Sequence, residues 1–379
     1  MRLPRALNPN ENPAQFGIFF SANRLKWLHR FPMAQNNTEP LPWHDRLWET
    51  CLRMGHQDRF SHAFLLRGPR GNGKGAFATR WANALVCQEP VSERRPCGRC
   101  RGCVLFGAGT HPDVGTIVPP SGKKSIGVDR IRELIDYVWL SRQLADRKVV
   151  IMPGAQEMTI NAANTLLKTL EEPPGEVVFM LIADRSDRLP ITIRSRCRFL
   201  EFPVPPAEVV LPWLESRLPP GTDAAPLLAA AGGAPLLAMG YWEENTLQER
   251  MRLDEELTGL LTGTADPLAV ATRWKEPGCT VLLPWIMGYV TELIRLRFRG
   301  TVAMEKDNAS PAGQYTGQWA RYSRRADTLG RLAREMDVRY GYHLFDRCLE
   351  ARRLWEESPG LNEALLLEGI AIDFAGARV

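Results

Sequence analysis

The sequence predicts an α/β fold with a parallel sheet, followed by an all-helical part. Short apolar runs alternate with segments of helical periodicity from Trp43 to about Pro203, as expected when helices connect parallel strands. A glycine-rich loop follows the first apolar run and precedes a helical segment. After residue 207 no convincing strand pattern remains, and helical periodicity dominates.

Five strands and three helices are expected in the first part. The apolar runs that predict strands lie at 62–68, 113–119, 148–154, 176–183 and 198–203. The predicted helices comprise the stretch "GKGAFATRWANALVC" and the residues 131–144 and 161–174. The last of these ends in a proline pair, which stops a helix.

The second part is predicted to contain two helical modules, because the glycine-rich stretch 229–240 interrupts its periodicity. Residues 300–316 are polar and rich in glycine and proline, which predicts a loop between helices. We therefore expect four regions. These are an N-terminal extension (1–40), an α/β domain (41–204), a small helical domain (205–243) and a larger helical domain (244–379).

Composition places few limits on function. The 379 residues have a net charge of +5, which permits contact with nucleic acid without requiring it. The apolar runs are expected to be too short to span a bilayer, so no membrane is expected as a partner. The first 40 residues match no targeting pattern, and we expect a disordered or misassigned start with Met33 as the initiator.

Four of the eight cysteines form a cluster with metal-ligand spacing, C-x9-C-x2-C-x2-C. They are Cys87, Cys97, Cys100 and Cys103. Four thiolates complete a tetrahedral zinc shell without an open position, so the expected role is structural. With the other cysteines scattered, a reduced cytoplasmic protein is indicated. The sequence also places arginines among these cysteines, and we expect them to face solvent rather than to contact phosphate. They are Arg94, Arg95, Arg99 and Arg101.

The stretch "GPRGNGKG" has the spacing of a nucleotide-binding P-loop. Its expected nucleotide-binding residues are Gly68, Gly71, Gly73 and Lys74. In such a loop, backbone N–H groups converge on phosphate, the following helix adds a favourable dipole, and the lysine neutralises charge.

Residues that ATP hydrolysis requires are missing. Gly75 stands where a hydroxyl would coordinate Mg²⁺. The strand at 148–154 is expected to neighbour the strand before the loop, and it ends in Pro153 and Gly154 instead of carboxylates. Glu157 lies too far beyond the strand end to replace them. We therefore expect hydrolysis to be lost, while the sequence leaves open whether Lys74 still holds ATP or ADP.

The order of motifs resembles the AAA+ subunits of the bacterial DNA polymerase III clamp loader. The resemblance rests on "RFSHAFLLRGPRGNGKG", the cysteine module, "GTHPD", "NAANTLLKTLEEPP" and "TIRSRCR". It covers roughly residues 43–240 closely. It implies an AAA+ domain, a helical lid domain at 205–243 and a helical collar domain at 244–379 that holds an oligomeric ring.

Within that family the departures resemble the non-hydrolysing delta-prime type rather than the ATP-hydrolysing gamma/tau type. The latter carries threonine after the P-loop lysine and an Asp-Glu pair where Pro153 and Gly154 stand. It also carries a lid arginine where "GGAPLLA" places Leu236. Three losses in one site favour the delta-prime interpretation.

The resemblance also assigns a role to Arg196 in "SRC". In this family that arginine projects into the ATP site of an adjacent subunit. An arginine finger supplied in trans accelerates phosphoryl transfer by about 10³–10⁵-fold. Lys168, Glu171 and Glu172 lie on the preceding predicted helix and are expected on the same face, although ordinary solvation explains them equally well.

The expected function is thus that of a delta-prime-like clamp-loader subunit of the DNA polymerase III holoenzyme. Expected partners are gamma/tau and delta subunits, the sliding clamp and primed DNA. Two alternatives remain open: an active gamma/tau-like ATPase, and a zinc-dependent DNA-binding module with a vestigial nucleotide fold.

Overall fold

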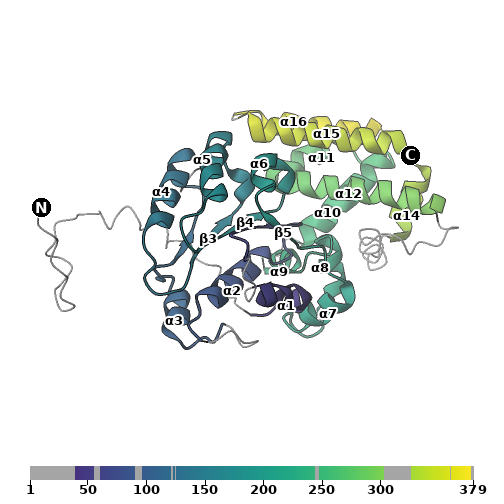
Figure 1. The fold of residues 1–379 in the computed structure, drawn as a ribbon. Helices are drawn as coiled ribbons and strands as arrows, with labels where there is room; N and C mark the ends of the chain where they lie inside the picture. Colours follow the sequence, from purple (N-terminus) through teal and green to yellow (C-terminus); the bar gives the residue numbers. More distant parts are fainter. Residues whose placement is uncertain are drawn as a thin grey trace, which may run out of the picture. The chain divides into compact units, whose positions relative to one another are not determined.

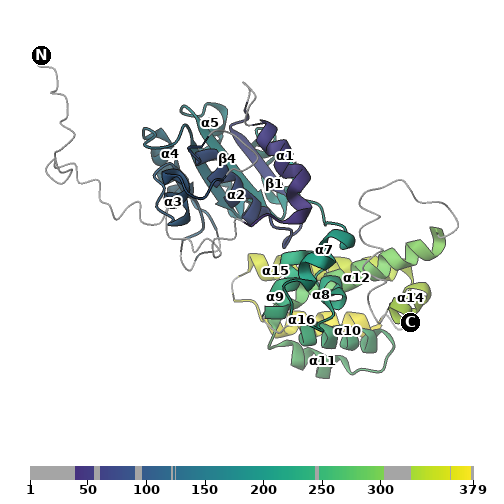
Figure 2. The same ribbon diagram turned by 90° about the horizontal axis from the view of Figure 1, so that it is seen from below.

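A computed structural model describes residues 39–54, 60–89, 96–120, 123, 125–243, 247–302, 326–358 and 360–376 (Figures 1 and 2). The predicted N-terminal extension, apart from residues 39 and 40, therefore lies outside the described residues. The chain forms two compact units. Unit 1 contains the described residues up to Gly68 together with Lys74–Phe202, and unit 2 contains Pro69–Gly73 and the described residues from Pro203 onward.

Unit 1 is built on a parallel five-stranded sheet, as the sequence predicts. Its strands are β1 (Ala63–Arg67), β2 (Val114–Thr116), β3 (Lys148–Pro153), β4 (Val177–Ala183) and β5 (Arg198–Glu201). Their order is β2-β3-β4-β1-β5, so β1 pairs directly with β4 and β5. The carboxyl ends of all five strands therefore meet at one edge of the sheet.

Helices cover both faces of this sheet (Figure 1). The elements are η3 (Pro42–His44), α1 (Asp45–Met54), α2 (Lys74–Val86), α3 (Arg101–Gly107), α4 (Val128–Trp139), η4 (Ala155–Glu157), α5 (Ile160–Glu171), η5 (Ser186–Arg188) and α6 (Ile191–Arg194). Alternate strand residues point to opposite faces. Leu65 accordingly packs in the core with α4 and α5, and its neighbours Phe64 and Leu66 pack in the core with α1 and α2.

Helix α4 ends earlier than the sequence predicts, at Trp139 instead of residue 144. The reason is the fully buried carboxylate of Asp113. It accepts the backbone N–H groups of Gln143, Leu144 and Ala145 at 2.7–2.8 Å. Those three groups would otherwise continue the helix, so the buried charge converts the predicted last turn into a loop.

The described residues of unit 2 form only helices and their connections (Figure 2). They are α7 (Ala207–Glu215), α8 (Ala224–Ala230), α9 (Pro235–Glu243), α10 (Leu247–Leu261), α11 (Pro267–Trp274), α12 (Gly278–Val302), α14 (Ala326–Glu335), α15 (Val338–Glu357) and α16 (Glu363–Gly376). The predicted break falls between α8 and α9, where Gly232 and Gly233 adopt positive φ. The predicted loop at 300–316 begins slightly later, because α12 reaches Val302; residues 303–325 lie outside the described residues.

Helix α12 corrects the expectation that the apolar runs are too short to span a bilayer. Residues Gly278–Phe298 of α12 pass a length-and-composition test for a membrane span. Within unit 2, however, α12 packs against α14 and α15 and buries Leu282, Ile286 and Val290 almost completely. These contacts account for its apolar character as that of a core helix.

Candidate functional site

The P-loop lies at the carboxyl end of β1, immediately before α2. Gly68 has a φ of +148°, and a Cβ there would lie 2.1 Å from the carbonyl oxygen of Phe202. Gly71 has a φ of +87°, and a Cβ there would lie 2.7 Å from Cβ of Leu237. Both positions therefore require glycine for conformation and space. Leu236, at the predicted position of the missing lid arginine, donates its backbone N–H to the Gly71 carbonyl at 3.0 Å.

Lys74 is held by acceptors of its own chain. Its side chain is only 4% exposed, and its Nζ donates to the Gly68 carbonyl at 2.6 Å. The same nitrogen lies 2.6 Å from a carboxylate oxygen of Asp184. A buried ammonium group requires such compensation, since its removal from water is costly. The cation that a P-loop offers to phosphate is here already paired.

The strand at 148–154 does not neighbour β1, so that prediction is wrong. Strand β4 lies between β3 and β1. The residue directly after β4 is Asp184, a carboxylate that the analysis missed. The available signal was a single acidic residue directly after an apolar run. This signal indicates a partner for Lys74 only when the strand order is known.

The predicted gaps in the catalytic site are present in the structure. Gly75 is the second residue of α2, and a Cβ added there would meet nothing within 4 Å. The space around position 75 would therefore admit a side chain with a hydroxyl group. At the end of β3, Pro153 closes the strand and Gly154 turns the chain with a φ of +64°. Neither supplies a carboxylate.

Arg196 is tied to the end of α5. Its Nε donates to a carboxylate oxygen of Glu171 at 2.7 Å, and Nη2 reaches the same oxygen. Nη1 donates to the Thr192 carbonyl at 2.9 Å. The arginine side chain is still 34% exposed. The predicted proximity of Glu171 and Arg196 is thus observed, with Glu171 fixing one edge of the guanidinium.

Arg196 and Lys74 lie at opposite edges of the parallel sheet. Lys74 and Asp184 follow the carboxyl ends of β1 and β4, whereas Arg196 precedes the first residue of β5. The end of α5 lies at the same edge as Arg196, because the Leu170 carbonyl bonds to His62 just before β1. The 7 residues of β4 span about 20 Å. Arg196 is therefore not part of its own P-loop site.

The four predicted cysteines converge beside α2 and α3. Their sulfur atoms all lie within 4.8 Å of one another. Sγ of Cys87 lies 3.9 Å from that of Cys100, and Sγ of Cys97 lies 3.9 Å from that of Cys103. Thiolates bound tetrahedrally at the Zn–S distance of about 2.3 Å stand about 3.8 Å apart. The cluster therefore has the dimensions of a four-thiolate metal site.

Backbone groups favour thiolate at one member of this cluster. Burial raises the pKa of Cys100, but hydrogen bonds from the N–H groups of Cys103 and Gln88, together with those from the thiols of Cys103 and Cys97, lower the pKa to about 6. Close packing of α3 on the end of α2 brings these groups together. A Cβ on Gly102 would lie 2.5 Å from the Val86 carbonyl oxygen, so this contact requires glycine. Arg99 and Arg101 are solvent-facing, as predicted, and Arg94 and Arg95 lie outside the described residues.

Comparisons with known proteins place the sequence in the DNA polymerase III system. Residues 43–206 match the family described as "DNA polymerase III, delta subunit". The chain is 34% identical over 342 residues to DNA polymerase III subunit delta' of Pseudomonas aeruginosa, covering 88% of this chain and 97% of that protein. It is 37% identical over 219 residues to the corresponding protein of Escherichia coli, covering 57% and 65% of the two chains.

A relative named as a tau subunit matches only part of the chain. DNA polymerase III subunit tau of Bacillus subtilis is 40% identical over 147 residues, which is 38% of this chain and 25% of that protein. The similarity to delta' extends much further along this chain than the similarity to tau.

Restoring the missing hydroxyl should not restore catalysis. We expect Gly75→Thr to fold, with a stability change below about 1 kcal/mol, because the site is open and threonine is tolerated in helices. Phosphate release from ATP should stay at background, since Pro153 and Gly154 still supply no carboxylate. Turnover by this variant would contradict the assignment of a defective site.

Removing the partner of Lys74 should both destabilise the protein and expose the amine. We expect Asp184→Asn to lower the free energy of unfolding by about 1–3 kcal/mol, between the values for surface and buried pairs. The affinity for ATP and ADP should rise, because Lys74 becomes available to phosphate. Urea denaturation and calorimetric titration measure the two effects.

Asp187→Asn is the matched control for this experiment, since its carboxylate is 69% exposed and pairs with Arg185 at 3.5 Å. It should change neither quantity. If Asp184→Asn left both unchanged, the ion pair would have no role in neutralising Lys74.

Proposed function

We propose a function from one premise: the chain belongs to the family of DNA polymerase III delta-prime subunits. In the proposed role it is a clamp-loader subunit that does not hydrolyse ATP itself. It takes part in loading the sliding clamp onto primed DNA by stimulating hydrolysis in a neighbouring gamma/tau subunit. The observation that carries this proposal is the position of Arg196 at the sheet edge away from its own P-loop.

The proposed loss of hydrolysis is supported by three features of the P-loop site. Position 75 has no hydroxyl, and β3 ends without a carboxylate. The ammonium group of Lys74 is paired with Asp184 at 2.6 Å, so a phosphate would have to compete with an internal carboxylate. The site thus lacks the Mg²⁺ ligands of phosphoryl transfer and offers a cation that is already neutralised. Any remaining binding of ATP or ADP would be weakened by this competition.

The proposed trans-acting arginine is supported by how Arg196 is held. Glu171 takes the Nε side of the guanidinium, and Nη1 donates to the Thr192 carbonyl and to Ser195 Oγ. The second N–H group of Nη2 is directed away from the Glu171 carboxylate. A guanidinium fixed in this way is oriented for a phosphate oxygen of another molecule without losing further rotamer freedom. Glu171 would then act as a positioning residue for Arg196.

The helical unit 2 is proposed to contain the lid and the oligomerising collar. Its last helix, α16, carries Leu365 and Ile372, which are 63% and 51% exposed. They are seven residues apart and therefore lie on one helix face. Such an apolar face is of the kind that subunit interfaces cover. The proposed partners are gamma/tau and delta subunits, and the proposed location is the cytoplasm.

The cysteine cluster is proposed to hold a structural Zn²⁺. Four thiolates and their spacing suit zinc, and four ligands leave no open coordination position. The ion would tie the end of α2 to α3. Catalysis is not proposed for this site.

Loss of the Arg196 side chain should slow ATP hydrolysis in the neighbouring subunit and leave the folding of this chain unchanged. In a reconstituted clamp loader we expect Arg196→Ala to lower DNA-stimulated ATP hydrolysis, with the adjacent site slowed by about 10³–10⁵-fold. Folding should be preserved, because partly exposed ion pairs contribute at most about 1 kcal/mol. Steady-state and single-turnover hydrolysis by the assembled complex measure the effect.

Arg198→Ala is the matched control, an exposed arginine two residues further on. A complex that contains this variant should hydrolyse ATP at the rate of the native complex. Normal hydrolysis with Arg196→Ala, in a complex of native composition, would refute the trans role.

Metal analysis tests the proposed zinc. We expect one Zn²⁺ per native chain by native mass spectrometry, and its loss in Cys100→Ser. Gly102→Ala should weaken metal retention without removing a ligand, since its new methyl group collides with the Val86 carbonyl. Cys348→Ala, a buried cysteine in α15, should retain the metal. Metal-free native protein, purified without chelator, would overturn the assignment.

A further inference from the structure

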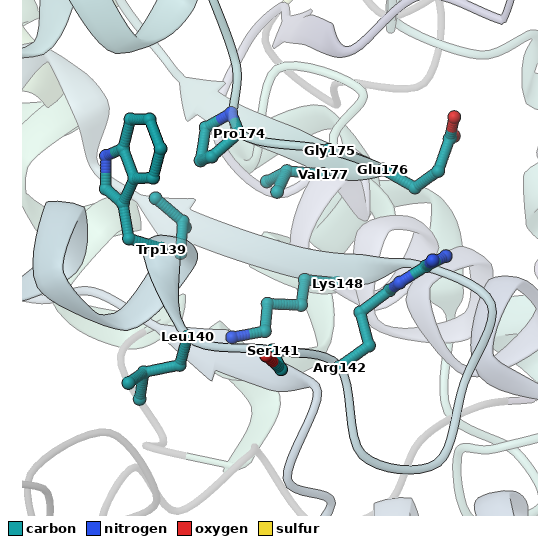
Figure 3. Close-up of a pocket in the computed structure, with 10 residues that line it drawn as sticks. Trp139, Leu140, Ser141, Arg142, Lys148, Pro174, Gly175, Glu176 and Val177 are labelled. Carbon is teal, nitrogen blue, oxygen red and sulfur yellow. The ribbon is translucent and has the colours of Figure 1, made fainter. Parts of the chain in front are cut away.

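A pocket of about 300 Å³ lies at the amino edge of the sheet in unit 1 (Figure 3). It is lined by residues 138–142 at the end of α4, by Lys148 at the start of β3, and by 174–177 leading into β4. The carboxyl edge, with Lys74 and Asp184, is at the other end of these strands. The pocket is therefore separate from the P-loop site.

Lys148 places an under-compensated cation in this pocket. The residue is 2% exposed, and its Nζ donates to the Tyr137 carbonyl at 2.7 Å. The Tyr137 ring centroid lies 4.5 Å from the same nitrogen. An ammonium group has three N–H donors, so two remain for other acceptors. Among the described residues, no carboxylate lies within ion-pair distance of Lys148.

The nearest buried negative charge is committed elsewhere. Asp113 accepts three backbone N–H groups of the loop after α4. Burial lowers the pKa of Lys148, and the Asp113 charge offsets this only in part. The Lys148 ammonium group can therefore form an ion pair and hydrogen bonds with a bound anion.

The rest of the pocket combines an apolar end with a polar end. In Figure 3 the rings of Trp139 and Pro174 flank one side, and Arg142 and Glu176 lie on the other. Trp139 is 67% exposed and Leu140 is 52% exposed, an unusual pair of large apolar side chains to leave in water. The Lys148 nitrogen lies on the side of Leu140 and Ser141 in this view.

We propose that this pocket binds an acidic peptide segment of a partner protein. A carboxylate of the segment accepts hydrogen bonds from Lys148 Nζ, and an adjacent apolar side chain covers Trp139 and Leu140. A carboxylate provides both the charge and the acceptors that the buried amine lacks. The exposed apolar side chains of Trp139 and Leu140 favour a segment with an apolar residue beside its carboxylate over the continuous phosphate chain of a nucleic acid. The proposal does not depend on the role of Arg196.

Fluorinated peptides test the site in the full-length protein. The probe is acetyl-(4-fluoro-Phe)-Asp-Leu-amide, with the Asn peptide as its uncharged counterpart, each titrated by ligand-observed ¹⁹F NMR. We expect the Asp peptide to bind about tenfold more tightly, the effect of one charge-assisted hydrogen bond. Lys148→Met should abolish this preference, and the exposed Lys123→Met should preserve it.

Trp139→Ala is a second variant that is expected to fold, because the side chain is largely exposed. This substitution should weaken the binding of both peptides several-fold and leave the preference for the Asp peptide unchanged. Equal binding of the two peptides, or an Asp preference that survives Lys148→Met, would overturn the carboxylate site. Isovalerate binding as tightly as the Asp peptide would overturn a peptide occupant. Displacement of the peptide by oligothymidine would indicate nucleic acid in its place.

Discussion

The P-loop region of this protein depends on how one buried ammonium group is neutralised. Lys74 is almost entirely removed from water, and such a group must be neutralised nearby. In an active P-loop, phosphate and its metal ion share that task with the loop. Here Asp184 and the Gly68 carbonyl contact the ammonium group. The P-loop spacing is therefore combined with an ion pair inside the same unit, which supports the proposed loss of hydrolysis.

The direction of the parallel sheet then separates two chemical surfaces. All strands point the same way, so groups that follow strands gather at one edge and groups that precede them gather at the other. Lys74 with Asp184 occupies the first edge, and Arg196 with Glu171 occupies the second. A chain of this construction has a self-satisfied site at one edge and a partly exposed cation at the other. This separation supports the proposed action of Arg196 on a neighbouring subunit.

Local polar constraints shape the regions around the sheet. Asp113 stops α4 by capturing three backbone N–H groups, and the resulting loop builds one wall of the pocket at Lys148. The cysteine cluster fixes the junction of α2 and α3, where Gly102 permits close approach of the chain. In both places a few polar atoms determine backbone paths that hydrophobic periodicity does not encode.

Features that depend on local spacing along the chain could be predicted without the structure. These are the five strands, the P-loop and its missing hydroxyl, the cysteine cluster, the helical second half and the candidate Arg196. Other features became visible only in the folded chain: β4 and not β3 adjoins β1, Asp184 therefore pairs with Lys74, and Lys148 is buried in a pocket. The reason is that strand order brings together residues far apart in the chain. Periodicity and spacing report the neighbours of a residue along the chain, whereas its charge partner is set by which strands lie side by side.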